Sequence, residues 1–240
     1  MGTCCIIIPC YNESKRLNKT KIIEFQKNNN AFDLLFVNDG STDNTLDVLI
    51  SIASISNNIN YLDLKINYGK AEAIRQSVLR LSKYDYIGYL DADLSTSLED
   101  ISRLLYFAKQ ESLSFVLGSR VKLIGHTIDR KYYRHFFGRI VATVIDSFIL
   151  KLGVYDTQCG AKIIKSELVQ VIFKQPFKTK WLFDVELLAR FKKEKGINSC
   201  LKEIREVPLL EWKDTRDTRI TFLEFLRTPL DLFRIYKSYR

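Results

Sequence analysis

The sequence predicts an α/β fold in which a mostly parallel β-sheet is flanked by helices. Short apolar segments alternate with longer segments of helical periodicity through the first half of the 240-residue chain. The apolar segments are nearly continuous, as expected of parallel strands covered by helices on both faces. Their spacing leaves room for a right-handed crossover helix between successive strands.

Five strands and four helices are expected before residue 120. The expected strands are residues 4–9, 34–37, 61–64, 86–90 and 115–117. The expected helices are residues 17–26, 45–55, 71–81 and 101–110. Polar turns separate these segments; Ser41 and Thr42, for example, suit the N-cap of a helix.

The second half of the chain lacks the regular alternation of strand and helix segments. Residues 126–152 and 183–193 are expected to be helical, residues 161–164 to form a strand, and residues 200–212 to be extended. From Phe222 the pattern predicts one or two amphipathic helices interrupted at Pro229. We therefore expect an α/β domain over residues 1–212 and an amphipathic tail over residues 213–240.

Composition narrows the function classes. A hydrophobic content of 46% allows a packed core and excludes wholesale disorder. The net charge of +9 favours an anionic partner, which can be a nucleic acid, a membrane or a phosphorylated substrate. The five cysteines lack zinc-site spacing and are expected to be reduced core residues. We see no signal peptide, and the longest apolar helical segment, residues 140–150, is too short to span a bilayer.

Polar side chains follow four of the expected strands at the point where each strand ends. They include Tyr11 after the first strand, Asp39 after the second, Asp91 and Asp93 after the fourth, and Arg120 after the fifth. Parallel strands bring their carboxyl ends to one edge of the sheet, which is where such folds bind ligands. The sequence therefore predicts one site at this edge.

Asp91 and Asp93 are candidates for a metal site. Alternation along the strand can point both carboxylates the same way, with Ala92 between them. Two carboxylates beside an anionic substrate suit a hard divalent cation, Mg²⁺ or Mn²⁺, which would bridge a diphosphate leaving group. The alternative interpretation is a solvated loop at the end of a strand, because a lone Asp-x-Asp pair is common.

Two further positions are candidates for nucleotide binding. Asp39 ends an apolar strand and can accept hydrogen bonds from a ribose or a base edge, or instead begin the next helix as an Asx-turn. Lys70 follows Asn67-Tyr68-Gly69 at the start of a helix, where backbone N–H groups and a lysine favour phosphate. The chain has neither a Walker A loop nor a GxGxxG motif.

Basic residues predominate between residues 118 and 151. Arg130 and Arg134, joined more loosely by Arg120, are expected to form a second anion site opposite the metal. The arginine fork binds two phosphate oxygens at once, which suits this role. The outer members, Lys122 and Lys151, are interpreted as a solvated face.

The tail alternates apolar and basic residues. An apolar face flanked by arginine and lysine suits an anionic membrane surface. A helix docked on the protein's own core has the same periodicity, so both interpretations stay open.

Together these segments resemble the family 2 glycosyltransferases with the GT-A fold, a Rossmann-like sheet. The likeness is narrowest to the dolichyl-phosphate β-glucosyltransferases and the bacterial polyprenyl-phosphate glycosyltransferases. It covers nearly the whole chain, in this order: IIIPCYNE, FVNDGSTDNT, NYGKAEAIRQS, YLDADLST, LGSR, DRKYYR, DTQCGAK, WLFDVELL and EVPLLEW. DGSTD is shared by many sugar transferases, whereas DADLST, DTQCGAK and WLFDVELL together are much more specific.

The resemblance implies a role for each matching position. Those that would line the nucleotide pocket are Pro9, Tyr11, Glu13, Asp39 and Lys70. Asp91 and Asp93 would hold the metal, and Arg120, Arg130 and Arg134 the acceptor phosphate. Those that would shape the sugar and acceptor side are Gln158, Trp181 and Asp184. In two places the chain departs from the family: Ser95 stands where related mannosyltransferases carry a glutamine, and Arg219 where a lysine is usual.

The expected activity is inverting transfer of a hexose from a nucleotide-sugar onto a polyprenyl or dolichyl phosphate. By resemblance UDP-glucose is favoured, and GDP-mannose is the alternative. We expect the protein to be peripheral on the cytoplasmic face of a membrane. A family 2 transferase acting on a saccharide hydroxyl is the nearest rival, and Asp184 or Glu186 would then be its base. A basic nucleic-acid-binding module is a remote rival, and no nucleic-acid partner is expected.

Overall fold

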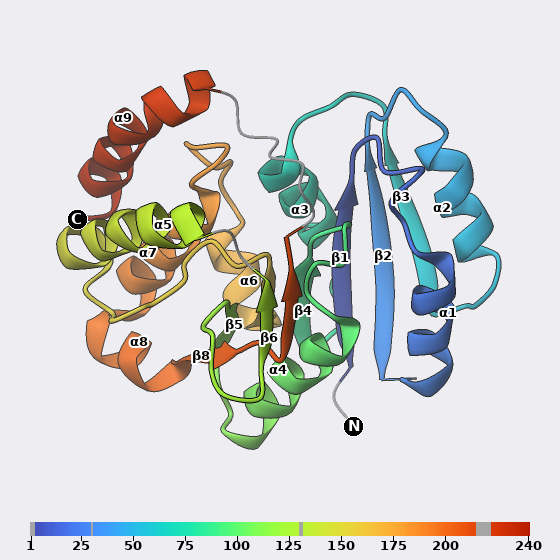
Figure 1. Ribbon diagram of the computed structural model, residues 1–240, viewed down its shortest axis with the longest axis horizontal. Helices are drawn as coiled ribbons and strands as arrows, with labels where there is room; N and C mark the ends of the chain where they lie inside the picture. Colours follow the sequence, from blue (N-terminus) through green and yellow to red (C-terminus); the bar gives the residue numbers. More distant parts are fainter. Residues whose placement is uncertain (1–2, 30, 130–131, 215–221) are drawn as a thin grey trace.

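The structure, a computed structural model, describes residues 3–29, 31–129, 132–214 and 222–240; for residues 132–137 and 222–226 it describes the backbone alone. A seven-stranded sheet forms its centre, with the strand order β3-β2-β1-β4-β7-β5-β8 (Figure 1). Only β7 in this sheet runs antiparallel, pairing with β4 and β5. The mostly parallel sheet predicted from the sequence is therefore confirmed.

The strands of this sheet are β1 (Cys4–Cys10), β2 (Phe32–Asp39), β3 (Ile59–Leu64), β4 (Tyr86–Leu90), β5 (Phe115–Ser119), β7 (Ala161–Lys165) and β8 (Ile204–Pro208). A second, two-stranded parallel sheet joins β6 (Thr127–Asp129) to β9 (Glu211–Lys213). β1, β4 and β5 are buried almost throughout, which explains their unbroken apolar sequences.

Helices cover both faces of the large sheet (Figure 1). They are α1 (Lys19–Asn28), α2 (Thr45–Ala53), α3 (Lys70–Val78), α4 (Leu98–Gln110), α5 (Tyr132–Ile145), α6 (Ser166–Ile172), α7 (Phe183–Lys195), α8 (Ile197–Glu203) and α9 (Phe222–Tyr239). Alternate side chains of β1 enter two hydrophobic clusters, one shared with α3, α6 and α7 and the other with α1, α2 and α4. The domain thus has three layers, with the sheet in the middle.

Two expectations for residues 126–212 were wrong in detail. Residues 126–152 do not form one helix, because residues 127–129 pair with β9 as β6 before α5 begins. The helix then ends in a π-helical turn, η1 (Asp146–Leu150), where the Asp146 carboxylate accepts the backbone N–H groups of residues 152–154. The start of the segment expected to be extended, residues 200–203, belongs to α8.

The C-terminal segment forms one helix that passes through Pro229 without interruption. Its inner side packs on the domain: Ile235 is fully buried in the cluster of α3, α6 and α7, and Leu232 and Tyr239 pack against that cluster. Pro229 itself is exposed, and this packing beyond it offsets the intrahelical hydrogen bond that a proline removes.

All five cysteines are free and buried, as expected of core residues. Burial raises the pKa of Cys159 and that of Cys5 to about 12, so both stay protonated thiols at neutral pH. Among the described helices, none combines the length and apolar character needed to cross a bilayer.

Candidate active site

The candidate site lies where the order of the strands reverses. β1 has β2 on one side and β4 on the other, so the loops that leave β1 and β4 separate there. Ligands of open α/β sheets bind outside the carboxyl ends of the strands at this point. Glu13 follows β1, Asp39 ends β2, and Asp91 and Asp93 follow β4, so the topology brings the predicted polar clusters to one edge.

Asp91 and Asp93 sit on a tight turn that ends β4. The backbone N–H of Leu94 donates to the carbonyl of Asp91 at 3.1 Å, and Leu94 adopts the left-handed region with a φ of 49°. A leucine there is strained, and such strain concentrates at functional sites. The side chains of Asp91 and Asp93 are 38% and 20% exposed, so neither carboxylate is buried in the core.

Each of these carboxylates faces a cation. Lys70 Nζ lies 2.5 Å from Asp91 Oδ1. Arg16 Nη2 lies 3.4 Å from Asp93 Oδ2, and its Nε lies 3.4 Å from Glu13 Oε2, so Arg16 links the loops after β1 and β4. Burial lowers the pKa of Lys70, but the negative charges around it outweigh that effect and leave the pKa raised. Lys70 is therefore a cation at neutral pH.

The donor set fits a divalent cation that a diphosphate also ligates. Asp91 and Asp93 supply hard oxygen ligands, and Lys70 and Arg16 show that these carboxylates attract positive charge. The described residues hold no group of three histidine, cysteine or acidic side chains that would bind a metal unaided. Mg²⁺ in particular is commonly held by one or two carboxylates together with substrate phosphates.

Gly160 lets the Asp91 carboxylate take its position. A Cβ at residue 160 would lie 1.8 Å from Asp91 Oδ2 and 2.4 Å from Asp91 Cγ. Gly160 belongs to the DTQCGAK segment, just before β7, which pairs with β4. A glycine is therefore required at this position because a larger residue would collide with the Asp91 side chain, which is almost seventy positions earlier in the sequence.

Gly160→Ala is therefore expected to displace the Asp91 carboxylate and to weaken Mn²⁺ binding. Altering the groups that orient a metal ligand typically costs about 10–100-fold in affinity. Calorimetric titration of Mn²⁺ in the presence of UDP measures the effect, and a thermal unfolding scan checks that the variant is folded. An unchanged Mn²⁺ affinity in a folded variant would contradict this role for Gly160.

Asp39 fastens the end of β2 to the loop before α3. Its Oδ1 accepts the N–H of Tyr68 and its Oδ2 the N–H of Gly69, both at 2.8 Å. Burial raises the pKa of Asp39, and these two hydrogen bonds offset part of the rise. The N–H groups of Tyr68 and Gly69, expected to favour phosphate, are thus bonded to Asp39. Lys70 is the first residue of α3, as that expectation requires.

The end of β5 is held by an ion pair. Arg120 donates from Nε and Nη2 to the two carboxylate oxygens of Asp156 at 2.6 and 2.8 Å, and its guanidinium lies 5.3 Å from the Trp212 ring centroid. Asp156 is fixed in turn, because its backbone N–H donates to Glu206 at 2.7 Å. The charge of Arg120 is therefore already compensated, and a phosphate would share it with Asp156.

A fully buried lysine lies beneath the site. Lys162 is 0% exposed, and its Nζ donates at 2.6 Å both to Asp184 Oδ1 and to the carbonyl of Cys159. Tyr89 also donates its hydroxyl to Asp184 Oδ1. A buried charge needs a partner of this kind. Lys162 thus ties β7, the DTQCGAK segment and the start of α7 together.

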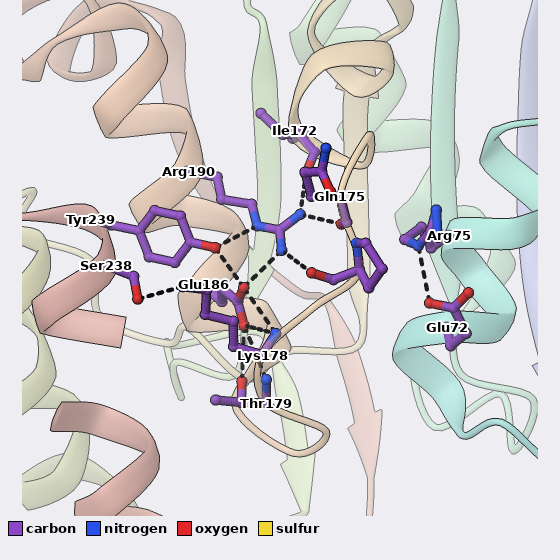
Figure 2. Close-up of polar contacts among 11 residues, drawn as sticks. Glu72, Arg75, Ile172, Gln175, Lys178, Thr179, Glu186, Arg190, Ser238 and Tyr239 are labelled. Atoms are coloured by element: carbon purple, nitrogen blue, oxygen red, sulfur yellow. Dashed lines mark hydrogen bonds and ion pairs between the residues drawn. The ribbon is translucent and has the colours of Figure 1, made fainter. Parts of the chain in front are cut away.

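Glu186 lies in the first turn of α7, in a buried network separate from that of Lys162 (Figure 2). It is 0% exposed and accepts hydrogen bonds from the N–H groups of Lys178 and Thr179, from Arg190 and from the Tyr239 hydroxyl. A carboxylate with these partners anchors the loop before α7 and the end of α9. This arrangement disfavours Glu186 as the catalytic base of the hydroxyl-acceptor rival.

The remaining predicted residues have different placements. Pro9 and Tyr11 are partly exposed at the end of β1, and Trp181 packs partly buried against the core just before α7. Gln158 is partly buried in the DTQCGAK segment, and its Nε2 has no hydrogen-bond partner within the described chain. Of the other predicted arginines, Arg130 and Arg219 lie outside the described residues, and Arg134 lies in α5, where only its backbone is described.

Sequence reasoning missed four residues that build the site: Arg16, Asp156, Gly160 and Lys162. A lysine inside the apolar strand segment AKIIK was the available signal for Lys162, because such a charge requires a buried partner. Asp156 and Gly160 lie in the DTQCGAK segment that carried the resemblance, although only Gln158 was singled out there. Nothing local distinguishes Arg16 from other surface arginines.

Residues 5–173 match the model of the family described as glycosyl transferase family 2. A dolichyl-phosphate beta-glucosyltransferase of Dictyostelium discoideum is 30% identical over 251 residues, covering 98% of this chain and 74% of the relative. One from Saccharomyces cerevisiae is 27% identical over 257 residues, covering 98% and 74%.

Solved structures share the fold. Glucosyl-3-phosphoglycerate synthase from Mycobacterium tuberculosis, in complex with uridine diphosphate, superposes with a TM-score of 0.73 at 18% identity, covering 98% of this chain and 80% of that one. The same enzyme in complex with Mn²⁺, UDP-glucose and phosphoglyceric acid gives a TM-score of 0.71 at 17% identity, covering 99% and 79%. The fold is thus that of the GT-A enzymes, as the resemblance implied.

Proposed function

Because the chain belongs to glycosyl transferase family 2, we propose that it transfers glucose from UDP-glucose onto a polyprenyl phosphate such as dolichyl phosphate. Its general class is a nucleotide-sugar-dependent glycosyltransferase. The observation that carries the finer proposal is the similarity to dolichyl-phosphate beta-glucosyltransferases, which extends over 98% of the chain. The paired Asp91 and Asp93 at the edge of the sheet support it, because a diphosphate leaving group requires a cation there.

The donor side is assigned to β1, β2 and β4. Asp91 and Asp93 would hold Mg²⁺ or Mn²⁺, and the bound cation would neutralise the charge that develops on the departing diphosphate. Lys70, now 2.5 Å from Asp91, would contribute its charge to the same phosphates. Mn²⁺ and UDP-glucose are bound by the structurally similar glucosyl-3-phosphoglycerate synthase, which supports this donor.

The acceptor needs little general-base help. A phosphate monoester has a second pKa of about 6 and is already largely ionised at neutral pH. Its oxygen would attack the anomeric carbon in line with the departing diphosphate and invert the configuration. What the protein must supply is alignment and charge compensation between two anionic substrates. The partners of Glu186 agree with this, since that carboxylate is fully engaged in the interior.

The nucleotide preference is tested by thermal unfolding with UDP and with GDP, each with and without Mn²⁺. UDP with Mn²⁺ is expected to raise the unfolding midpoint most, since a ligand stabilises the state that binds it. A larger shift with GDP would contradict UDP-glucose as donor and favour GDP-mannose.

The acceptor site is tested by Arg134→Ala. We expect the KM for a short polyprenyl phosphate to rise by about 10–100-fold, the loss of one charge-assisted contact, while binding of UDP is unchanged. Initial rates at varied acceptor concentration measure this, and Lys122→Ala, an exposed basic residue in the loop between β5 and β6, is the matched control. An unchanged acceptor KM would count against the role of Arg134.

A lipid acceptor implies that the protein works at a membrane surface, on its cytoplasmic face.

A further inference from the structure

Two neighbouring helical elements expose apolar side chains. On α5 and η1, Ile140, Val144 and Phe148 recur every four residues and are 49%, 45% and 69% exposed. On α9, Leu230 and Phe233 are 60% and 63% exposed. Residues spaced by three or four lie on the same side of a helix, so each element presents an apolar stripe to solvent.

α9 is held firmly in place by its opposite side. The Tyr239 hydroxyl donates to Glu186 at 2.7 Å and accepts from Arg190 at 3.1 Å (Figure 2). Lys178 Nζ donates to the Ser238 hydroxyl at 2.7 Å, which ties the last turn to the loop before α7. The outward stripe therefore has a fixed orientation on the domain, unlike that of a tethered helix.

The two stripes belong to adjacent elements. α9 contacts both α7 and η1, and Figure 1 shows α5 beside α9 on the β5–β8 side of the sheet. We call the five residues Ile140, Val144, Phe148, Leu230 and Phe233 the apolar stripes.

Basic side chains flank the stripes. Among the side chains that the structure describes in these elements and directly after them, the exposed basic ones are Lys151, Arg227, Arg234, Lys237 and Arg240. Only two acidic side chains are described in these elements: Asp231, which pairs with Arg234 at 3.0 Å, and Asp146, which accepts backbone N–H groups. The exposed bases therefore outnumber the described acids. This part of the surface is therefore apolar and basic together.

We propose that the apolar stripes and their flanking bases form a docking surface for an anionic phospholipid membrane. Apolar side chains enter the boundary between headgroups and acyl chains, while lysine and arginine attract the anionic headgroups. A second copy of this chain is a poorer occupant, because a two-fold contact would place the same bases opposite one another. The charge thus favours a lipid surface over self-association.

This inference rests on the proposed function, because the acceptor lipid phosphate lies in the membrane that the surface would bind. The connection lies in α5, whose first turn carries Arg134, the predicted acceptor-phosphate residue, and whose later turns carry the exposed stripe. Docking would therefore bring the acceptor side of the domain to the plane that holds the phosphate of the lipid.

The test is co-sedimentation of the full chain with phosphatidylcholine vesicles, with and without phosphatidylglycerol. The variant Phe148→Glu with Phe233→Glu is compared with Leu201→Glu, a matched control on α8 where the leucine is 58% exposed. We expect the wild type and the control to bind the anionic vesicles, and the double variant to bind about tenfold or more weakly. Binding should also weaken as salt is added, because salt screens the basic residues.

Three results would overturn the proposal: no binding of the wild type to anionic vesicles, equal binding of the double variant, or a dimer in solution that the double variant dissociates. UDP binding in the absence of vesicles shows whether each variant is folded. If the double variant does not bind UDP, Phe148→Ser with Phe233→Ser is used in its place. Vesicle binding and glucose transfer to a detergent-dispersed polyprenyl phosphate are separate readouts. Loss of the first alone rejects the surface, and absence of the second alone rejects the proposed function.

Discussion

Asp93→Asn is expected to lower turnover about a thousandfold, equivalent to about 4 kcal/mol of transition-state stabilisation. The substitution keeps the shape of the side chain and removes the charge, so the cation that neutralises the departing diphosphate would be held poorly. Asp93 also pairs with Arg16, which links the loops after β1 and β4, so some loss of order at the site is expected too. Initial rates with UDP-glucose and Mn²⁺ measure the effect.

The matched control is Asp47→Asn, an exposed carboxylate in the first turn of α2. It removes the same charge away from the predicted metal ligands, and we expect its turnover to stay within about twofold of the wild type, since surface substitutions are usually mild. If Asp93→Asn retained turnover similar to that of Asp47→Asn, the metal role of the pair would be wrong.

Arg190→Ala is expected to lower the free energy of unfolding by about 3–5 kcal/mol, the cost of breaking a buried ion pair. The Arg190 guanidinium donates to Glu186 at 2.8 Å and to the carbonyls of Ile172, Gln175 and Pro176 at 2.7 Å each. Removing it leaves the fully buried Glu186 carboxylate without its ion-pair partner and the buried carbonyl of Ile172 without this donor. Urea unfolding measures the loss.

Arg234→Ala is the matched control for this change. Its pair with Asp231 is on the exposed side of α9, with the arginine side chain 63% exposed, so about 1 kcal/mol or less is expected. An Arg190 variant with a loss as small as that of Arg234 would show that the network in Figure 2 contributes little to stability.

Sequence patterns predict the parts of this fold that depend on residues close together in the chain. They do not predict the parts that depend on residues far apart in the chain. β1, β4 and β5 are buried almost throughout, so continuous apolar segments identified them, and the topology of the parallel sheet then placed Asp39, Asp91 and Asp93 at one edge. β6 was missed because it is three residues long and pairs with β9, more than eighty positions later. No local pattern contains that pairing.

The candidate site divides in the same way. The positions of the residues at strand ends follow from the parallel sheet. The residues that contact them come from distant segments of the chain. Lys162 is tolerated inside β7 only because Asp184 reaches it from α7. Gly160 is required by the position of Asp91, and Arg120 is fixed by Asp156. Such partners are set by tertiary packing, which composition and periodicity do not encode.

The proposed glucose transfer is tested most directly by locating the transferred sugar. The full chain is incubated with UDP-glucose, Mn²⁺ and a short polyprenyl phosphate, and the lipid fraction is analysed by mass spectrometry. We expect a polyprenyl phosphate heavier by one hexose, absent when Mn²⁺ is chelated. UDP released with no glucosylated lipid, or glucose found on a saccharide hydroxyl instead, would contradict it.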